Sequence, residues 1–372
     1  MDAKLSSQQQ VLNTSGVALA SLLAGGIILA AIVLDGIANR LPWQFSSLTL
    51  PILLAAVTSA ILGYVVLPLL QTLKTGQIIR EDGPKTHLKK AGTPTMGGIF
   101  FVPTAVLIAC IGSGFTTDVL AISALTLSFG FIGWIDDWQI LRFKSNKGIS
   151  PQIKLVLQIF LATVFCSWMM FTQPASITSI ALPFDIFLPL GFLFWPLASF
   201  VLVAESNATN LTDGIDGLAG GVVAVSSLAL GAMVAPTSPD LMIFCASLSG
   251  GCLGFLVHNR NPARVFMGDT GSLSLGSALA GVALLTNSLV GLFILSGIFF
   301  VETLSVVLQV SYYKATKGSD GRGKRLFKMA PLHHHLELSG WSELQLVAVF
   351  YFIAEILAVS GLVINSSMGT LG

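Results

Sequence analysis

Long apolar stretches, separated by short polar connections, run along almost the whole chain. Each holds about 18 to 25 residues, the length that a helix needs to cross the roughly 30 Å hydrocarbon core of a bilayer. Backbone polar groups find no water in lipid, and no alternating pattern indicates a barrel. The pattern therefore predicts an all-α, polytopic membrane bundle of about eleven transmembrane helices. The expected spans are 14–36, 48–72, 96–115, 117–135, 152–172, 188–206, 217–236, 240–257, 271–287, 290–313 and 342–367.

The composition agrees with this prediction. Hydrophobic residues make up 53% of the chain, charged residues 10%, and the mean hydropathy is +0.82, values outside the range of soluble domains. The start of the chain is poor in basic residues and its first apolar run is long, so we expect that run to be retained rather than cleaved. The cysteines, Cys110, Cys166, Cys245 and Cys252, fall within or beside apolar spans, so neither a disulfide nor a zinc framework is expected.

Basic residues gather in a few of the connections. Seventeen of the nineteen Lys and Arg residues lie in the segments 74–90, 142–154, 260–264 and 314–328. The positive-inside rule makes these segments cytoplasmic, and in the eleven-span arrangement an even number of crossings separates each from the next. The same parity places the N-terminus and residues 207–216 inside and the C-terminus outside. Among the outer connections, residues 173–187 have strand-like character and are candidates for a small hairpin.

Two adjacent carboxylates, Asp136 and Asp137, follow the span 117–135, where the helix is expected to end. The C-terminal end of a helix carries partial negative charge, so a carboxylate pair there needs a cation nearby. One interpretation is an anchor at the membrane interface, neutralised by Arg142 and Lys144. The other is a magnesium site, because magnesium prefers one or two carboxylates with phosphate oxygens and water, and one carboxylate then acts as a base.

Further cations and small residues predict anion binding near this pair. Lys147 and Lys154 follow it closely enough to hold a phosphate. In residues 81–98, Lys90 offers a point charge, and Thr95 and the two glycines after it let phosphate oxygens approach backbone amides. The alternative is that the basic residues bind anionic headgroups and that the glycines and prolines are ordinary turn residues.

Four polar side chains recur at every third position after the span 188–206. They are Asn207, Asn210, Asp213 and Asp216, and on a helix such a stripe drifts slowly round one face. Amides and carboxylates in this register suit hydrogen bonding to a sugar, a nucleobase or metal-bound water. Asp216 alone can be explained as the N-cap of the following helix, but an N-cap does not explain the whole stripe.

The segment 258–272 combines cations, an aromatic ring and an acid. Asp269 precedes an apolar helix, so capping is again the alternative to a functional role. Phe266 lies near Arg260 and Arg264 in the sequence and offers a stacking face for a nucleobase. The alternative is that this ring packs against the protein.

Three consecutive histidines, His333 to His335, follow the basic run 324–328. A histidine tract suggests a metal site, but consecutive residues do not share a helix face, and no cysteine lies nearby to complete a zinc set. Imidazoles that donate hydrogen bonds to a diphosphate fit better, because they are readily protonated near neutral pH.

These tracts, in this order, resemble the bacterial phospho-N-acetylmuramoyl-pentapeptide transferases of the polyprenyl-phosphate N-acetylhexosamine-1-phosphate transferase superfamily. The resemblance runs from about Gly76 to the C-terminus, and the three histidines followed by Leu-Glu favour this branch over its N-acetylglucosamine relatives. The matching tracts are Gly92–Gly98, Asp136–Asp137, Asn210–Ala219, Phe266–Gly271 and Pro331–Glu337.

The resemblance implies an activity and its setting. The expected reaction transfers phospho-MurNAc-pentapeptide from UDP-MurNAc-pentapeptide to undecaprenyl phosphate and releases UMP, the first membrane step of peptidoglycan synthesis. Magnesium is the implied cofactor and a homodimer the implied assembly, in the bacterial inner (plasma) membrane with the active site facing the cytoplasm; no nucleic-acid partner is expected. The family typically has ten helices, so residues 48–372 would form the transferase domain and residues 1–47 an extra N-terminal transmembrane segment.

The resemblance also implies residue roles. Asp269 would be the metal ligand, and Asp136 the base that deprotonates or orients the lipid phosphate, with Asp137 beside it. The groups that hold phosphates or position the acids would be Asn210, Lys147, His333 and His334. The uridine and nucleotide-sugar pocket would comprise Lys90, Thr95, Asp213, Asp216, Asn259 and Phe266.

Two other classes of protein compete with this interpretation. A lipid transporter generally places charged groups near the bilayer midplane, whereas here Glu302 and Glu355 are the only acids well inside the expected spans and neither has an evident cationic partner in the sequence. A structural metal-binding protein would need the histidine tract as its main ligand set. For the enzyme, we expect direct attack by the lipid phosphate rather than an aspartyl-phosphate intermediate.

Overall fold

The computed structural model describes residues 2–72, 90, 92–143, 148–184 and 186–366, with side chains from Ser15 onward. The helices are α1 (Asp2–Ile37), α2 (Thr49–Thr72), α3 (Gly98–Gly112), α4 (Thr117–Phe143), α5 (Pro151–Thr172), α6 (Phe194–Thr212), α7 (Leu218–Val234), α8 (Pro239–Asn259), α9 (Gly268–Leu285), α10 (Leu289–Leu295), α11 (Gly297–Ala315), α12 (Leu332–Glu337) and α13 (Glu343–Asn365). The strands are β1 (Ser179–Leu182) and β2 (Ile186–Pro189), with short 3-10 turns at Ala175–Thr178 and Gly191–Leu193.

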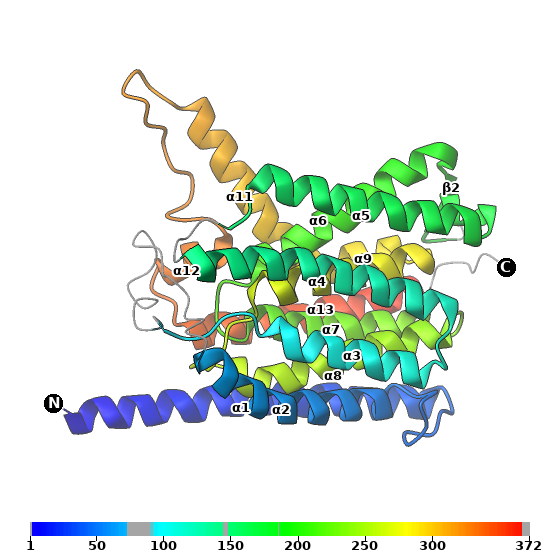
Figure 1. Ribbon diagram of the computed structural model, residues 1–372, viewed down its shortest axis with the longest axis horizontal. Helices are drawn as coiled ribbons and strands as arrows, with labels where there is room; N and C mark the ends of the chain where they lie inside the picture. The colour runs from blue at the N-terminus through cyan, green and yellow to red at the C-terminus, as the bar shows by residue number, and fades with distance from the viewer. Residues whose placement is uncertain (1, 73–89, 91, 144–147, 185, 367–372) are drawn as a thin grey trace.

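Most of the helices lie side by side along the long axis of the molecule, as Figure 1 shows. In the described chain, seven are long and apolar enough to cross a membrane: α1, α2, α4, α5, α6 with the turn before it, α8 and α13. The helices α10 and α11 form an eighth candidate, bent by 70° at the break between them. Each span expected from the sequence coincides with a helix or with this bent pair, which confirms the all-α membrane bundle. The count of about eleven crossings stays a prediction.

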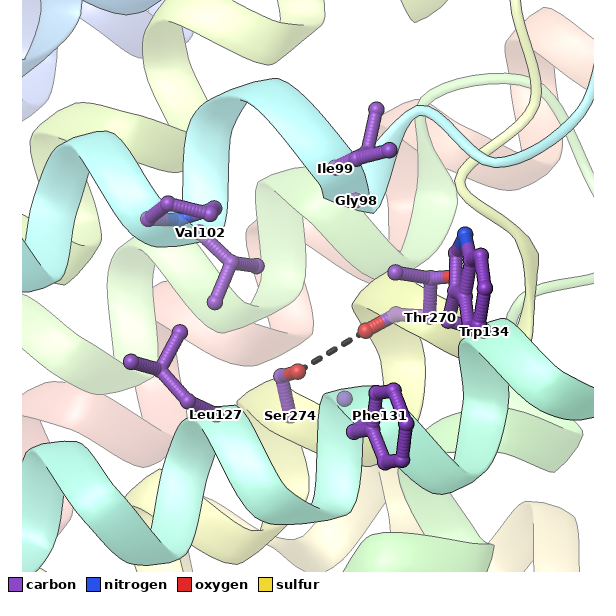
Figure 2. A pocket seen from close by; sticks show the side chains of 10 residues that line it. Gly98, Ile99, Val102, Leu127, Phe131, Trp134, Thr270 and Ser274 are labelled. Carbon is purple, nitrogen blue, oxygen red and sulfur yellow. Dashed lines mark hydrogen bonds between the residues drawn. The ribbon is translucent and has the colours of Figure 1, made fainter.

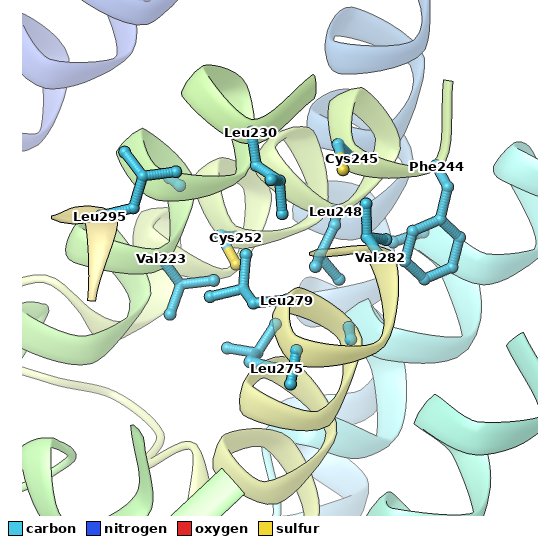
Figure 3. Close-up of a cluster of buried hydrophobic side chains, with 14 of the residues drawn as sticks. Val223, Leu230, Phe244, Cys245, Leu248, Cys252, Leu275, Leu279, Val282 and Leu295 are labelled. Atoms are coloured by element: carbon cyan, nitrogen blue, oxygen red, sulfur yellow. The ribbon is translucent and has the colours of Figure 1, made fainter. Parts of the chain in front are cut away.

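The centre of the bundle is formed by α7, α8 and α9, which are almost completely buried. Figure 3 shows their side chains interleaved, with Val223 and Leu230 from α7, Leu248 from α8 and Leu279 from α9. All four cysteines are unpaired and buried, as the sequence predicts. A helix that is apolar on every side must be enclosed by others, so the remaining helices surround these three.

Glycines set how closely the helices of this bundle approach one another. A methyl group at Gly250 or Gly254 of α8 would collide with the carbonyl oxygens of Ile52 and Ala56 on α2. The close packing that small residues permit is therefore realised within one chain, between α2 and α8.

The predicted hairpin is confirmed. β1 and β2 pair antiparallel, with Ile180 opposite Leu188. They lie at the opposite end of the bundle from α12 in Figure 1, as the parity of the spans predicts for residues 173–187 and the histidine tract.

The helix α1 lies beside α2 along one face of the bundle (Figure 1). Its last turn carries Asp35, which is fully buried and accepts hydrogen bonds from the amides of Leu48 (3.0 Å) and Thr49 (3.0 Å) and from the Thr49 hydroxyl (2.7 Å). Arg40 donates to the same carboxylate at 3.1 Å. Asp35 thus caps the beginning of α2 from the end of α1. The assignment of residues 1–47 as an extra segment stays a prediction.

Candidate active site

The helix α4 reaches the beginning of α9 because it presents glycines there. A methyl group at Gly130 would collide with the Ser274 hydroxyl, and one at Gly133 with the carbonyl of Asp269. With hydrogen atoms at both positions, the backbones approach closely, and the carboxylate pair follows within one turn of Gly133 on the same helix.

The helix α4 continues through Asp136 and Asp137 to Phe143, so the expectation that the helix ends just before the pair is wrong. Asp137 is buried and accepts hydrogen bonds from the amides of Asp269 (3.2 Å) and Thr270 (3.0 Å) and from the Thr270 hydroxyl (2.7 Å). These amides belong to the first turn of α9, where the helix dipole favours negative charge. The carboxylate therefore meets the favourable pole of a second helix.

The capping interpretation of Asp269 is accordingly wrong. The N-cap of α9 is Met267, and no side chain of its own caps it. Asp137 supplies that interaction from α4, which leaves both oxygens of Asp269 for other partners.

Side chains from three other helices surround Asp269. Asn210 at the end of α6 donates to its Oδ1 (2.7 Å) and to the Ser272 hydroxyl (2.9 Å). Lys154 of α5 is hydrogen-bonded to its Oδ2. Asp136, whose Oδ1 accepts from the amide of Ile149 (2.9 Å), is close enough for its charge to act on that of Asp269. The structure therefore brings Asp136, Asp137, Asn210 and Asp269 together as predicted.

Among the described residues, Lys154 is the cation that contacts these acids. The interface-anchor interpretation relied on Arg142 and Lys144, but the guanidinium of Arg142 lies over the Phe143 ring, 5.9 Å from its centroid. Lys144 and the predicted phosphate holder Lys147 lie outside the described residues.

Asp213 adds negative charge to the cluster. Burial, followed by the charges of Asp269, Asp137 and Asp216, raises the pKa of Asp213 to about 8. The helix α6 ends at Thr212, so the predicted stripe does not continue along one helix. Asp213 and the residues after it turn away from the axis instead.

A second cluster surrounds Lys90. Its ammonium group contacts Asp216 Oδ1 (2.8 Å) and Glu343 Oε2 (2.8 Å). Burial alone would lower the pKa of Lys90, but the charges of and hydrogen bonds to these two carboxylates outweigh it, and the pKa is raised. Lys90 therefore stays cationic at neutral pH.

Asp216 does not cap α7, contrary to the capping interpretation, because the N-cap is Gly217 and lacks any side-chain hydrogen bond. Oδ2 of Asp216 instead accepts hydrogen bonds from the backbone amide of Ala263 (2.9 Å) and from the side-chain amide of Asn261 (3.3 Å). This carboxylate joins Lys90 to the loop between α8 and α9.

The remaining predicted pocket residues hold loops together. Asn259 is buried, accepts from the amide of Gly217 (2.9 Å) and donates to the carbonyl of Val265 (2.9 Å). Phe266 is half-buried, and its amide donates to the carbonyl of Pro94 at 2.8 Å. Thr95 is buried in the same connection, beside Gly268.

The amides of Gly97 and Gly98 donate to the carbonyls of Phe266 (2.8 Å) and Met267 (3.0 Å). They are not directed at an anion, as the sequence suggested for these glycines. Their role is to tie the beginning of α3 to the beginning of α9.

The histidine tract forms α12. His333 is buried and pairs with Glu302 of α11, its Nδ1 lying 3.1 Å from Oε2, and its ring packs against Gly214. His334 pairs with Glu337, Nδ1 to Oε2, at 2.9 Å. The sequence shows no evident partner for Glu302, because the partner that the structure gives it, His333, is distant in the sequence and only the fold brings it near.

Figure 2 shows an apolar groove between α3, α4 and α9, lined by Gly98, Ile99, Val102, Pro103, Leu127, Gly130, Phe131, Trp134, Thr270 and Ser274. Its volume is about 180 Å³. The Thr270 hydroxyl is already bonded to Asp137, and that of Ser274 to the Thr270 carbonyl (2.8 Å). The groove thus offers a dry contact surface for an apolar chain.

Sequence reasoning missed Glu343, Asn261, Ser272 and the role of Glu302 in this arrangement. Glu343 is the first residue of α13 and Ser272 lies inside α9, so neither stands out in its local context. Lys154 was predicted to hold a phosphate, but its pairing with Asp269 from the first turn of α5 was not predicted.

The residues present fit a magnesium ion. Asp136, Asp137, Asp213 and Asp269 bring several carboxylates together, and Lys154 is their cationic neighbour. No group of three His, Cys, Asp or Glu side chains forms a ready metal cage among the described residues. Magnesium binds to one or two carboxylates and takes its other ligands from phosphate and water, so an incomplete oxygen site of this kind is suitable.

Two family models match this chain. The model of glycosyl transferase family 4 matches residues 119–287, and a phospho-N-acetylmuramoyl-pentapeptide-transferase signature matches residues 90–102. These matches include the carboxylate pair, Asn210, Asp269 and Lys90.

Full-length relatives carry the same family name. The phospho-N-acetylmuramoyl-pentapeptide-transferase of Trichormus variabilis is 77% identical over 96% of this chain and 98% of its own length. Those of Nostoc punctiforme and Gloeothece citriformis are 76% and 60% identical, over 96% and 98% of this chain and 99% and 100% of their own lengths. The chain therefore belongs to the phospho-N-acetylmuramoyl-pentapeptide-transferase family of membrane transferases.

Proposed function

We propose that the protein transfers phospho-MurNAc-pentapeptide from UDP-MurNAc-pentapeptide to undecaprenyl phosphate, forming undecaprenyl-diphospho-MurNAc-pentapeptide and UMP. The observation that carries this proposal is the convergence of Asp136, Asp137 and Asp269 with Asn210 and Lys154 at one end of a membrane bundle. Oxygen-rich, negatively charged sites of this kind bind a divalent cation together with phosphates. Family membership supplies the identity of the substrates.

The reaction is a displacement at phosphorus. An oxygen of the lipid phosphate attacks the β-phosphorus of the nucleotide sugar, the bond to the bridging oxygen breaks, and UMP leaves with that oxygen. Two anions must approach each other, so catalysis depends on positioning and charge neutralisation. A magnesium ion bound at Asp269 would neutralise phosphate charge and hold the reactants in line.

The protein's own groups have distinct roles in this proposal. Asp136 accepts the proton of the lipid phosphate or orients it, and Asp137 fixes the beginning of α9, so that Asp269 keeps its place. Lys154, with Lys147, His333 and His334, binds phosphate oxygens, while Asn210 holds Asp269. Lys90, Thr95, Asp213, Asp216, Asn259 and Phe266 form or support the nucleotide-sugar pocket, and Phe266 stacks on uracil.

We place the site on the cytoplasmic side of the bacterial inner membrane and propose a homodimer. The basic segments support this orientation, and α12 lies at the end of the bundle opposite the β-hairpin (Figure 1). The transporter hypothesis loses support, because the buried acid Glu302 is bonded to His333 and not directed into a pathway.

The test is release of UMP by the purified protein. It should require UDP-MurNAc-pentapeptide, undecaprenyl phosphate and magnesium together, and UDP-N-acetylglucosamine should not replace the nucleotide sugar. No release in any detergent or lipid would contradict the proposal, and activity with UDP-N-acetylglucosamine would favour the related branch. Trapping a phosphorylated aspartate with the nucleotide sugar alone would replace direct attack by a two-step mechanism.

A further inference from the structure

A carboxylate and an imidazole, Glu302 of α11 and His333 of α12, form a pair that is closed to solvent. The exposed fraction of both side chains is 0%. Glu302 Oε2 lies 3.1 Å from His333 Nδ1, and Oε1 accepts from the His333 backbone amide at 3.2 Å. An acid inside a membrane helix is costly and generally has a function, so this pair requires an explanation.

The two contacts determine which ring nitrogen is available. As a carboxylate, Glu302 accepts hydrogen bonds and donates none, so its contact with Nδ1 requires the tautomer of His333 in which Nδ1 carries the proton. The other nitrogen, Nε2, then faces away from the carboxylate with its full bonding capacity. A glutamine at position 302 would not replace the acid, because its amide has a single acceptor oxygen for the two N–H groups of His333.

The free nitrogen is buried and lies against a residue next to the acidic cluster. Among the described residues, Nε2 of His333 has no hydrogen-bond partner and almost no exposure to solvent. It points at Gly214, where a methyl group would collide with it, and Gly214 follows Asp213 of the acidic cluster. A buried polar atom without a partner is destabilising, and a ligand bound at Nε2 would remove that cost.

We propose that Glu302 is a positioning residue, which holds His333 so that Nε2 binds a phosphate oxygen of the nucleotide-sugar diphosphate. This inference rests on the proposed function, since it assigns a partner to a histidine of that site. Glu302 acts through His333 and does not touch the substrate itself. Outer partners that orient a functional histidine typically change binding or activity by about 10- to 100-fold when they are lost.

The chain contains a matched control. Glu205 of α6 is also a buried carboxyl in a membrane helix, but it accepts a single neutral hydrogen bond, from the Ser296 hydroxyl at 2.6 Å. The substitution Glu205→Gln removes the same charge and leaves an acceptor for that one donor. Any general effect of losing a buried acid should therefore appear in both glutamine variants.

The test compares Glu302→Gln, His333→Ala, the double variant and Glu205→Gln in the full-length protein. We expect Glu302→Gln to lower kcat by about 10- to 100-fold with a smaller change in KM for the lipid, and Glu205→Gln to keep wild-type kcat. In the His333→Ala background, Glu302→Gln should change kcat by less than about twofold, because residues that act as one unit are not additive. Independent, multiplicative losses would overturn the proposal, as would wild-type kcat in Glu302→Gln.

A binding measurement separates this inference from the proposed function. With magnesium present, Glu302→Gln should weaken the binding of UDP by about 10-fold and leave that of uridine unchanged, because only UDP carries the phosphates. Equal losses for both probes would indicate a structural role and overturn the inference. If the wild-type protein binds UDP in this way but transfers nothing, the proposed function fails and the inference stands. If the wild-type protein transfers phospho-sugar but Glu302→Gln weakens the binding of UDP and uridine equally, the inference fails and the proposed function stands.

Discussion

Asp269 is bonded to two other helices of the site, through Asn210 of α6 and Lys154 of α5. The substitution Asp269→Asn keeps an acceptor for Asn210 and removes the charge that a magnesium ion requires. We expect UMP release to fall by about 100- to 1,000-fold, while the melting temperature stays close to that of the wild type. Initial rates over a magnesium titration and a thermal melt in detergent measure the two effects.

The control for this charge removal is Asp118→Asn. Asp118 lies in the first turn of α4, far from the pair on the same helix, and accepts a hydrogen bond from Gln173 at 3.0 Å. Its variant should retain full activity. Unchanged turnover in Asp269→Asn would remove Asp269 from the metal site.

Asp213 predicts a pH dependence of stability. Its pKa in the folded protein is raised to about 8, against about 3.9 in an unfolded chain. Between those values the unfolded state has lost the proton and the folded state retains it, so the contribution of this group to the free energy of unfolding falls as pH rises. This contribution is fully present below about pH 4 and is lost as the pH rises through about 8.

The substitution Asp213→Asn removes this dependence, because an amide does not ionise. In magnesium-free protein the variant should be more stable than the wild type by about 1 to 3 kcal/mol at pH 8, allowing for partial exposure of the carboxyl. The gain should shrink toward pH 5. Melting temperatures measured from pH 5 to 9 with a chelator test this, and a gain that stays constant or shrinks with rising pH would contradict it.

At the residue scale, the sequence predicted which side chains gather but not all of their partners. Asp136, Asp137, Asn210 and Asp269 meet as expected, because motif order and the shared membrane face constrain them. The partner of Glu302 is 31 positions away and that of Lys90 is Glu343, 253 positions away. Such pairs depend on tertiary packing, which local spacing does not contain.

At the scale of elements, Asp35 is the connection between α1 and the rest of the bundle. Asp35→Ala would leave the amides of Leu48 and Thr49 and the Arg40 side chain without their acceptor. Breaking a buried, charged network costs about 3–5 kcal/mol, so we expect a clear drop in melting temperature. The kcat of the folded fraction should be unchanged, because this junction lies outside the catalytic cluster.

Arg40→Ala is the matched variant, since it removes one donor and keeps the three bonds from Leu48 and Thr49. Its loss of stability should be smaller than that of Asp35→Ala. Equal losses would mean that the ion pair, and not the cap on α2, holds α1 in place.

The positions of the helices were predictable, but some of their ends were not. Hydropathy located α4 because about 19 apolar residues suffice to mark a span. It did not show that the helix continues to Phe143, because the last turns are stabilised by bonds from other segments, such as that from the Ile149 amide to Asp136. The bend between α10 and α11 was likewise invisible, since both halves are apolar.

At the scale of the whole molecule, the orientation in the membrane can be tested with cysteine labelling. The four native cysteines are buried and should react slowly with an impermeant maleimide. Ser46 and Ser319 are both exposed, the first in an expected outer connection and the second in the basic segment 314–328.

In intact cells, Ser46→Cys should be labelled and Ser319→Cys protected, and both should react after permeabilisation. The basic segment that contains Ser319 should be retained on the cytoplasmic side. Ser46 should then lie outside, because an odd number of expected crossings separates the two positions. Both variants should retain UMP release, because neither serine belongs to the acidic cluster. Labelling of Ser319→Cys in intact cells would place the catalytic end of the bundle outside, away from a cytoplasmic nucleotide sugar. Labelling of neither cysteine would put both positions on the inner side, which would mean that an even number of crossings separates them and would contradict the predicted arrangement of spans.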